Sequence, residues 1–342
     1  WRVATLKRKW RAVRRNMEEI TNPQVDSTDD TAKAESEGKP FKSGYIAVVG
    51  RPNVGKSTLP NRLSGQKIAA VSPRPQMTQR NQLGILTTDE AQLILIDTPG
   101  IHTAKSKLGE VMNESARSTF TDADWILWIV DASEKPTAED LAIAAEFKKL
   151  NVMAHVIVAL NKVDLLRGAK REKAGAEFKQ ALPDAVFIEI SAQTGLGCSD
   201  LLHELIARVP EGPMFYDPDQ ITDLYEREIA RDLIRESLLN NLDEEIPHSI
   251  GVRIEEFIDR SETQSYINAT LLLDRESHKS IVIGKNGMKL KKIGSDARVE
   301  IEKMTERKVY LELKVKVVKN WRDNPAILKS MGFNLDRGSE KR

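Results

Sequence analysis

Five short apolar runs separated by helix-like stretches constrain the fold of the 342-residue chain more than any other feature. The runs are rich in β-branched residues, as buried strands are, and the stretches between them are amphipathic. Strands that alternate with helices form βαβ units and a mostly parallel sheet. We expect strands at 45–49, 93–97, 125–132, 156–161 and 186–190, and helices at 109–120, 137–150, 171–181 and 199–209.

The alternation stops at residues 209–219, which contain three prolines and a glycine. A domain boundary is expected there, because such residues break regular structure. The sequence beyond it indicates a small α+β domain. Its expected elements are a charged amphipathic helix over 220–240, strands over 248–259, 265–274 and 309–317, and a helix beginning near Met288.

A glycine-rich segment follows the first strand and precedes a helix, as the phosphate-binding loop Gly-x-x-x-x-Gly-Lys-Ser requires. In such a loop the backbone N–H groups surround the β-phosphate. Lys56 supplies a positive charge to the β- and γ-phosphates, and the Ser57 hydroxyl reaches Mg²⁺. The candidate contact residues are Gly50, Arg51, Pro52, Asn53, Val54, Gly55, Lys56, Ser57 and Thr58.

The strand at 93–97 ends in Asp97-Thr98-Pro99-Gly100. A carboxylate at this position can hold Mg²⁺ through water, and the Gly100 N–H can meet a γ-phosphate. This tetrapeptide alone is often only a turn. It becomes informative because a phosphate-binding loop precedes it in the chain.

Two later strands are followed by motifs that suit guanine. The Asp164 carboxylate can accept hydrogen bonds from the N1–C2 edge of guanine, which adenine cannot offer, while the Lys162 stem covers the base and Asn161 ties the loop together. The Ala192 N–H can donate to guanine O6. The alternative for the first motif is a helix cap, but all four motifs in order predict a site for GTP and Mg²⁺. The base-side residues are Asn161, Lys162, Val163, Asp164, Ser191 and Ala192.

The order of these motifs resembles that of the translation-factor-related GTPases, and the wider match resembles the Era family. The resemblance covers about residues 43–335 and rests on GRPNVGKSTL, GQKIAAVSPRPQMTQR, DTPG, NKVD, SAQTG and IVIGKNGMKLKKIGSDAR. It implies an α/β P-loop GTPase domain with helices on both faces of the sheet, followed by a smaller α+β KH domain. The expected parts are a disordered extension (1–40), a GTPase domain (41–212), a linker and KH domain (213–335) and a tail (336–342).

The resemblance also implies the activity and the partners. Members hydrolyse GTP to GDP and phosphate and assist assembly of the small ribosomal subunit, so the expected partners are its rRNA 3′ end and the assembling subunit. A monomer without DNA binding is expected.

The family pattern assigns three residues to the metal shell and three to catalysis, with Thr78 in both sets. Thr78 of the first switch completes the Mg²⁺ ligands with Ser57 and Asp97, and Lys56, Thr78 and Gly100 serve the reaction. Here Met77 and Gln79 flank Thr78 where members usually have Thr and Arg, so the metal-binding threonine is kept while its neighbours in the switch differ.

Two further positions bear on the rate of hydrolysis. Ile101 stands where Ras-like proteins have the glutamine that orients the attacking water, so slow intrinsic turnover is expected. Related GTPases use K⁺, held partly by a residue that corresponds to Asn53. The alternative for Asn53 is a hydrogen bond that stabilises the loop.

Pro60 stands where the family usually has leucine, inside the helix expected after the phosphate-binding loop. It removes one backbone hydrogen bond and pushes its ring against the Lys56 carbonyl, which costs about 3 kcal/mol in a helix interior. The phosphate-facing N–H groups all lie upstream of it. We expect nucleotide binding to persist with a kinked or shortened helix. The alternative is a sequencing error.

The second domain contains a Gly-x-x-Gly loop, which in KH domains clamps the backbone of about four single-stranded nucleotides. Residues 276–320 hold twelve Lys and Arg against six Asp and Glu. The loop alone is a weak signal, and a basic helix face is usually only solvated, but the surrounding elements favour RNA binding. The candidate RNA-binding residues are Ile283, Gly284, Lys285, Asn286, Gly287, Lys289, Lys291 and Lys292.

Two other interpretations stay open at this point. The altered switch and Pro60 would also suit a hydrolysis-deficient RNA-binding scaffold with a degenerate GTPase domain. Residues 1–15 carry seven basic and no acidic side chains, which would suit weak or peripheral membrane contact.

The location of the protein is predicted from the same extension. A basic start before an acidic linker favours an organelle, with the plastid stroma before the mitochondrial matrix and a bacterial-type cytoplasm as the alternative. A solvated tail, with or without RNA contact, is equally compatible with the basic start. The one cysteine, Cys198, excludes an intramolecular disulfide.

Overall fold

The computed structural model describes residues 40–65, 78–100, 104, 106–168, 171, 175–242, 246, 249–333 and 335. Several expectations lie outside these residues. They are the extension up to residue 39, the first-switch residues before Thr78, Ile101 and the tail from residue 336.

The first domain is built on one six-stranded sheet with the order β2-β3-β1-β4-β5-β6. All neighbouring pairs are parallel except β2 and β3. The strands are β1 (Lys42–Val49), β2 (Gln82–Thr87), β3 (Ala91–Asp97), β4 (Trp125–Asp131), β5 (Val156–Asn161) and β6 (Val186–Glu189). The expected parallel sheet is confirmed, and its carboxyl end gathers the four nucleotide motifs.

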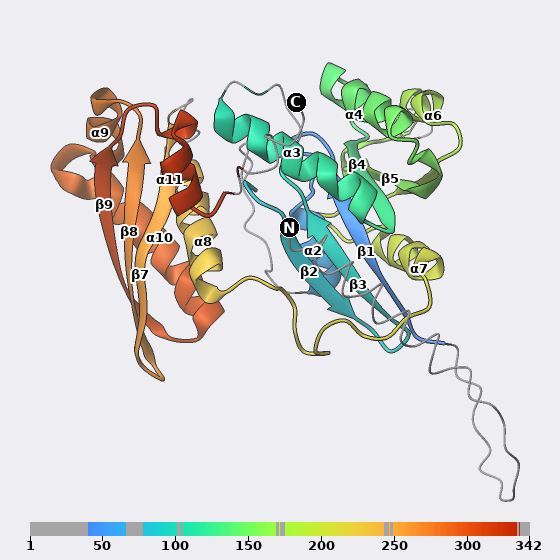
Figure 1. The fold of residues 1–342 in the computed structure, drawn as a ribbon. Coiled ribbons are helices and arrows are strands. Elements are labelled where there is room, and N and C mark those ends of the chain that lie inside the picture. The colour runs from blue at the N-terminus through green and yellow to red at the C-terminus, as the bar shows by residue number, and fades with distance from the viewer. Residues whose placement is uncertain are drawn as a thin grey trace, which may run out of the picture.

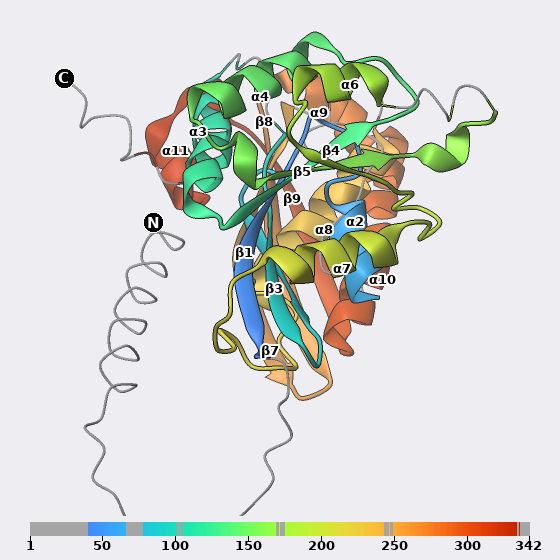
Figure 2. The ribbon, with the colours of Figure 1, turned by 90° about the vertical axis from the view of Figure 1, so that its right-hand side faces the viewer.

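Helices cover both faces of this sheet (Figures 1 and 2). On one face Phe120, Phe147 and Phe178 share a core with β4 and β5, and on the other Leu59 and Leu201 pack with β1 and β3. Burial on both sides explains why the strands read as continuous apolar runs. The helices are α2 (Thr58–Ser64), α3 (Lys107–Asp122), α4 (Ala138–Lys149), α6 (Ala176–Ala181) and α7 (Cys198–Arg208).

Strand β2 was not expected, and neither was its pairing with the linker after residue 209. The Ile85 N–H donates to the Ile221 carbonyl at 2.8 Å, and the Gln92 side chain accepts from the Phe215 and Tyr216 N–H groups. Extended linker residues therefore cover the open edge of the sheet. This is why the helix expected from residue 220 begins only at Glu226.

The second domain has a three-stranded sheet, β7-β8-β9, in which β8 is antiparallel to β7 and parallel to β9. Alternating side chains of the strands bury one face of this sheet against helices. Ile234 and Ile301 are among the helix side chains in this core. The elements are α8 (Glu226–Asn241), β7 (Gly251–Ser261), β8 (Gln264–Leu273), α9 (Glu276–Ile283), α10 (Met288–Thr305), β9 (Lys308–Val317) and α11 (Pro325–Ser330).

An apolar cluster joins the two domains. Leu108 and Met112 of α3 pack with Trp321 and Leu328, which lie beside and within α11. The indole N–H of Trp321 donates to the Ser249 carbonyl at 2.9 Å and fixes the ring. In Figure 1, α11 lies on the side of the second domain that faces α3.

Candidate nucleotide and RNA sites

The three candidate Mg²⁺ ligands lie together at the carboxyl ends of β1 and β3. The Ser57 hydroxyl donates to Asp97 Oδ2 at 2.7 Å, and the Thr78 hydroxyl donates to the same oxygen at 3.1 Å. The other carboxylate oxygen of Asp97, Oδ1, is buried without a hydrogen-bond partner among the described residues. Hard oxygen ligands around an unsatisfied buried carboxylate fit Mg²⁺.

Lys56 and Asp97 are buried side chains with opposite charges. Burial lowers the pKa of Lys56 to about 8, with the nearby Arg51 acting in the same direction. Burial also raises the pKa of Asp97. Lys56 Nζ donates to the Arg51 carbonyl at 2.8 Å, so the ammonium is held against the loop itself. An anionic phosphate beside Lys56 and a cation beside Asp97 would each oppose these shifts.

Asn161 links three segments of the site, as expected. Its Nδ2 donates to the Val54 carbonyl at 2.6 Å, and its Oδ1 accepts from the Ala192 N–H at 2.9 Å. The second bond differs from the expectation that this N–H faces guanine O6. A guanine contact at Ala192 would have to share or break its bond to Asn161.

The close approach at Asn161 explains why residue 55 is glycine. A Cβ on Gly55 would lie 2.3 Å from Asn161 Nδ2, and its φ of 108° is one that side-chain-bearing residues rarely adopt. The phosphate-binding loop therefore packs directly on the base-side loop.

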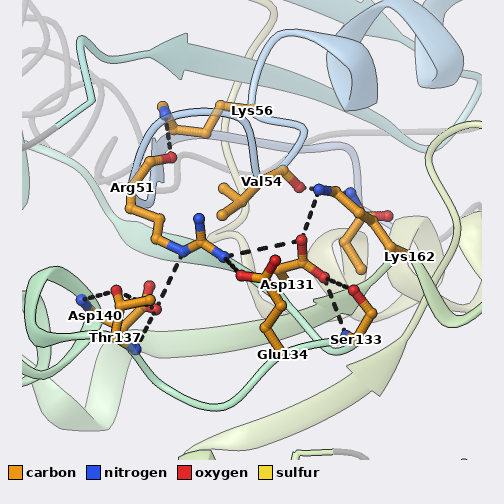
Figure 3. Close-up of polar contacts among 10 residues, drawn as sticks. Arg51, Val54, Lys56, Asp131, Ser133, Glu134, Thr137, Asp140 and Lys162 are labelled. Atoms are coloured by element: carbon orange, nitrogen blue, oxygen red, sulfur yellow. Dashed lines mark hydrogen bonds and ion pairs between the residues drawn. The ribbon is translucent and has the colours of Figure 1, made fainter. Parts of the chain in front are cut away.

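Lys162 and Asp164 of the base-side loop differ in their surroundings. Lys162 Nζ donates to Asp131 Oδ2 at 2.6 Å (Figure 3). The pKa of Asp131 is lowered although its burial acts the other way, because hydrogen bonds from Lys162 and Ser133 outweigh burial. Asp164 is half-buried and has no hydrogen bond or ion pair with another described residue. Its oxygens therefore fit the role of acceptors for a base.

The Arg51 side chain turns away from the phosphate-binding loop toward acidic residues (Figure 3). It pairs with Glu134 at 2.6 Å and with the buried Asp140 at 3.3 Å, and lies 3.9 Å from Asp131. Asp140 also completes the capping box of α4 with Thr137. The Arg51 side chain thus anchors the loop to α4, and only the backbone of Arg51 remains available to face a phosphate.

Sequence reasoning missed Asp131, Glu134 and Asp140. The only signal was their position at the end of an apolar strand and in the polar segment that follows it, DASEKPTAED. Their partners, Arg51 and Lys162, lie on other elements. Pairing across the sheet could therefore not be read from spacing.

Pro60 lies in the first turn of α2, as its third residue, and is buried beside Leu59. The Leu59 N–H still donates to the Gly55 carbonyl at 3.0 Å, so the turn that carries Lys56 forms. The helix ends at Ser64 and is short, as expected. A proline in a first turn disturbs a helix less than one in its interior, since several N–H groups there have no helical acceptor.

The Gly-x-x-Gly loop lies between α9 and α10, and the run before it is helical. Gly284 has a φ of 72°, and a Cβ there would lie 2.6 Å from the Lys289 Cβ. Asn286 also has a positive φ, 52°, so the loop is tightly turned. Lys285 and Asn286 are exposed, and the large apolar side chains of Ile281 and Met288 are exposed on either side.

The other candidate RNA residues lie at or beside the first turns of α10. Lys291 is exposed and Lys289 half-buried, whereas Lys292 pairs with Asp296 at 2.7 Å. Ile283 is half-buried at the end of α9. The loop and helix thus offer a basic surface with apolar neighbours, which suits a nucleic-acid backbone with unstacked bases. Lys292 must therefore leave Asp296 before it can bind an RNA phosphate.

The described residues show neither a helix that could cross a membrane nor a group of three metal-binding side chains of the His, Cys, Asp and Glu type. The Mg²⁺ candidates do not form such a group because two of the three are hydroxyls.

Comparisons with known proteins match both halves of the chain. Residues 45–162 match the family model described as a 50S ribosome-binding GTPase, and residues 245–322 match that of the KH domain. The chain is 44% identical to GTPase Era of Ruminiclostridium cellulolyticum over 87% of its own length and 99% of that protein. It is 46% identical to GTPase Era of Caldicellulosiruptor saccharolyticus, over 86% of this chain and 98% of the other.

A solved structure matches over the same extent. Era in complex with MgGDPNP and nucleotides 1506–1542 of 16S ribosomal RNA is 40% identical and superposes with a TM-score of 0.82. The match covers 86% of this chain and all of that one.

Proposed function

Since the chain belongs to the Era family of GTPases, we propose that it hydrolyses GTP to control its binding to the 3′ end of small-subunit rRNA during subunit assembly. The observation that carries this proposal is the presence of both sites in one chain. Ser57, Thr78 and Asp97 converge on one point, and an exposed Gly-x-x-Gly loop precedes α10. The solved Era complex with MgGDPNP and 16S rRNA supports the pairing of these two ligands.

In the proposed reaction Lys56 holds the β- and γ-phosphates, and the loop backbone surrounds them. Ser57, Thr78 and Asp97 would hold Mg²⁺, which supplies charge neutralisation at the phosphates. Gly100 lies close to the loop, since a Cβ there would be 3.2 Å from Lys56 Nζ. Its N–H is thus in the right region to meet a γ-phosphate. Asp164 selects guanine, and Asn161 keeps the base-side and phosphate-side loops in register.

The test of this function is GTP turnover by the full chain with and without a single-stranded rRNA 3′-end oligonucleotide. We expect slow basal turnover that the RNA stimulates. GTP binding without any turnover under either condition would instead support the hydrolysis-deficient scaffold, which the complete ligand set at Asp97 does not favour.

A role for K⁺ at Asn53 is a finer proposal. Asn53 is exposed and has a φ of 64°, so part of its value can be conformational. Asn53→Gly keeps this backbone accessible and removes the side-chain oxygen. Turnover of the parent should be faster in K⁺ than in Na⁺, and the variant should lose this difference. An equal K⁺ effect in both proteins would reject the role.

We also propose an organellar location, in the plastid stroma before the mitochondrial matrix, with a bacterial-type cytoplasm as the alternative. The basic residues 1–15 followed by an acidic stretch support it. The match to the R. cellulolyticum protein covers 99% of that protein but 87% of this chain, so part of this chain lies outside it. Imaging a fluorescent fusion that keeps residues 1–40 would decide between the compartments.

The basic start also motivates weak peripheral membrane contact, and we propose that the protein is monomeric and does not bind DNA. Sedimentation with anionic vesicles, with and without residues 1–20, tests the membrane contact. Light scattering tests the monomer, and a duplex DNA control in the RNA-binding assay tests the preference for RNA.

A further inference from the structure

A cavity of about 400 Å³ lies where the two domains meet, and its lining contains none of the residues assigned to the two sites above. Arg80 lines it from the first domain. Its other walls come from the start of α8, from β7 and from the segment that ends α11. The lining includes four arginines, Arg80, Arg227, Arg231 and Arg253, and one carboxylate, Glu228.

The single carboxylate in the wall already has partners. One oxygen of Glu228 lies 3.7 Å from Arg80, and the other accepts from the Tyr225 N–H at 3.3 Å in the capping box of α8. Asp232 pairs with Arg231 at 2.8 Å, and Glu255 pairs with Arg253 at 2.6 Å. Three carboxylates therefore stand against the four lining arginines, and positive charge is in excess by one.

Arg80 shows this excess most clearly. Its guanidinium stacks on the Phe333 ring at 4.8 Å, and its Nε is buried without a hydrogen-bond partner among the described residues. Only 22% of its side chain is exposed. A buried guanidinium with an unused donor needs an anion.

We propose that this interdomain cavity binds a small molecule that carries two or more phosphoryl groups. Guanidinium forks match phosphoryl oxygens in pairs, and four of them around one space favour a multivalent anion over a single carboxylate. The volume suits a ligand of up to nucleotide size. The exposed ring of Tyr225 in the wall is available to stack on a planar group. Such a ligand would bridge the domains, since Arg80 and the other three arginines belong to different ones.

Inorganic pyrophosphate is the simplest probe. It would be titrated calorimetrically into the full protein saturated with GDP and Mg²⁺, so that the phosphate-binding loop is already filled. We expect saturable binding near one per chain, and weaker binding of inorganic phosphate. Arg231→Gln with Arg253→Gln should weaken pyrophosphate binding at least tenfold. Lys314→Gln, an exposed cation on β9 outside the cavity, should change it less than twofold.

Folding of each variant is checked by its melting curve without pyrophosphate. If the double variant fails to fold, Arg253→Gln alone replaces it, because the Arg253 side chain is 29% exposed. Equal binding by parent and pocket variants would overturn the proposal. A second result would also overturn the proposal: the parent does not bind pyrophosphate, but the double variant loses binding of the rRNA oligonucleotide. The cavity would then belong to the RNA surface.

Discussion

Both ligand sites of this chain present turned glycine backbone to phosphate, but their surroundings differ. At the sheet edge, Lys56, Asp97 and Asn161 are buried, and each is hydrogen-bonded to the phosphate-binding loop. In the KH loop, Lys285 and Asn286 are exposed. Buried charges must be compensated by a matching ligand, whereas exposed ones interact in water and are screened by salt.

The difference teaches where specificity and affinity come from in each site. A missing partner in the buried site leaves polar groups unpaired, which costs about 1–3 kcal/mol for each group. The exposed site gains affinity by neutralising phosphates, with a salt slope of about −0.7 for each contact on a single strand. Nucleotide binding should thus depend on single atoms, and RNA binding on summed charge.

The largest effect should come from Asp164→Asn. It removes a charged acceptor from the guanine edge, and two charge-assisted hydrogen bonds together correspond to at least about 100-fold in GTP affinity. The amide can instead donate to the 2-oxo group of xanthine, so affinity for xanthosine triphosphate should rise. Fluorescent nucleotide titrations measure both. Asp184→Asn, at an exposed aspartate between α6 and β6, is the control. Unchanged GTP affinity in Asp164→Asn would show that NKVD does not read the base.

Lys285→Asp combined with Asn286→Asp tests the exposed site. Two carboxylates would face the RNA backbone while the glycines stay, so binding of the rRNA 3′-end oligonucleotide should fall below detection in a filter-binding assay. RNA-stimulated hydrolysis should be lost with it, and GTP binding should persist because these residues lie in the other domain. Lys148→Asp with Lys149→Asp on α4 introduces a similar charge change at exposed positions. If both double variants bind RNA as the parent does, the loop is an ordinary turn.

A matched pair of asparagines compares the two sites directly. Asn161→Ala leaves the Val54 carbonyl and the Ala192 N–H buried without this partner, so the free energy of unfolding should fall by about 2–4 kcal/mol. Asn286→Ala removes an exposed side chain from a left-handed position and should cost about 1 kcal/mol. Denaturant unfolding measures both. Equal losses would contradict the buried-versus-exposed distinction.

The pH dependence of nucleotide binding follows from Lys56. Its pKa is lowered to about 8 in the nucleotide-free protein, whereas the pKa of a lysine in the unfolded chain is near 10.4. Between about pH 8 and pH 10.4, Lys56 is therefore protonated in the unfolded chain and mostly neutral in the folded one. The nucleotide-free protein should gain stability as pH rises through this window. The stabilisation by GDP should shrink over the same rise, because the phosphates need the ammonium form. Melting curves with and without GDP at about pH 7 and pH 9 measure this. A GDP shift of constant size would contradict it.

Pro60→Leu should have the smallest effect. Because Pro60 lies in the first turn of α2, the gain in stability should be below the roughly 3 kcal/mol expected for a helix interior. GTP affinity should change little, since the phosphate-facing backbone precedes residue 60. A gain as large as the interior value would mean that the proline strains the helix more than its position indicates.

The sequence predicted the parallel sheet and the convergence of its motifs because buried strands and loop motifs are local patterns. It also predicted that Asn161 would tie the base-side loop, which the bonds to Val54 and Ala192 bear out. It did not predict β2, because a short edge strand containing a glycine has a weak pattern and depends on the linker that covers it.

The parts that escaped prediction are contacts between distant segments. Asp131 and Asp140 acquire meaning only through Arg51 and Lys162, and Arg80 only through the arginines of α8 and β7. The redirection of the Ala192 N–H to Asn161 also required coordinates. Hydrophobic periodicity predicts which face of a helix or strand is buried. The partner of a charged side chain depends on how the helices and strands pack together.

The cluster around Trp321 has a consequence for the order in which the chain becomes native during synthesis. Lys107 at the start of α3 and its partner Asp323 are 216 positions apart, so the ribosome produces the first partner long before the second. Until α11 emerges, Leu108 and Met112 of α3 have no cover from Trp321 and Leu328. A nascent or C-terminally truncated chain therefore carries an apolar surface that invites aggregation. Residues translated after the sheet of the second domain thus complete the surface of the first domain.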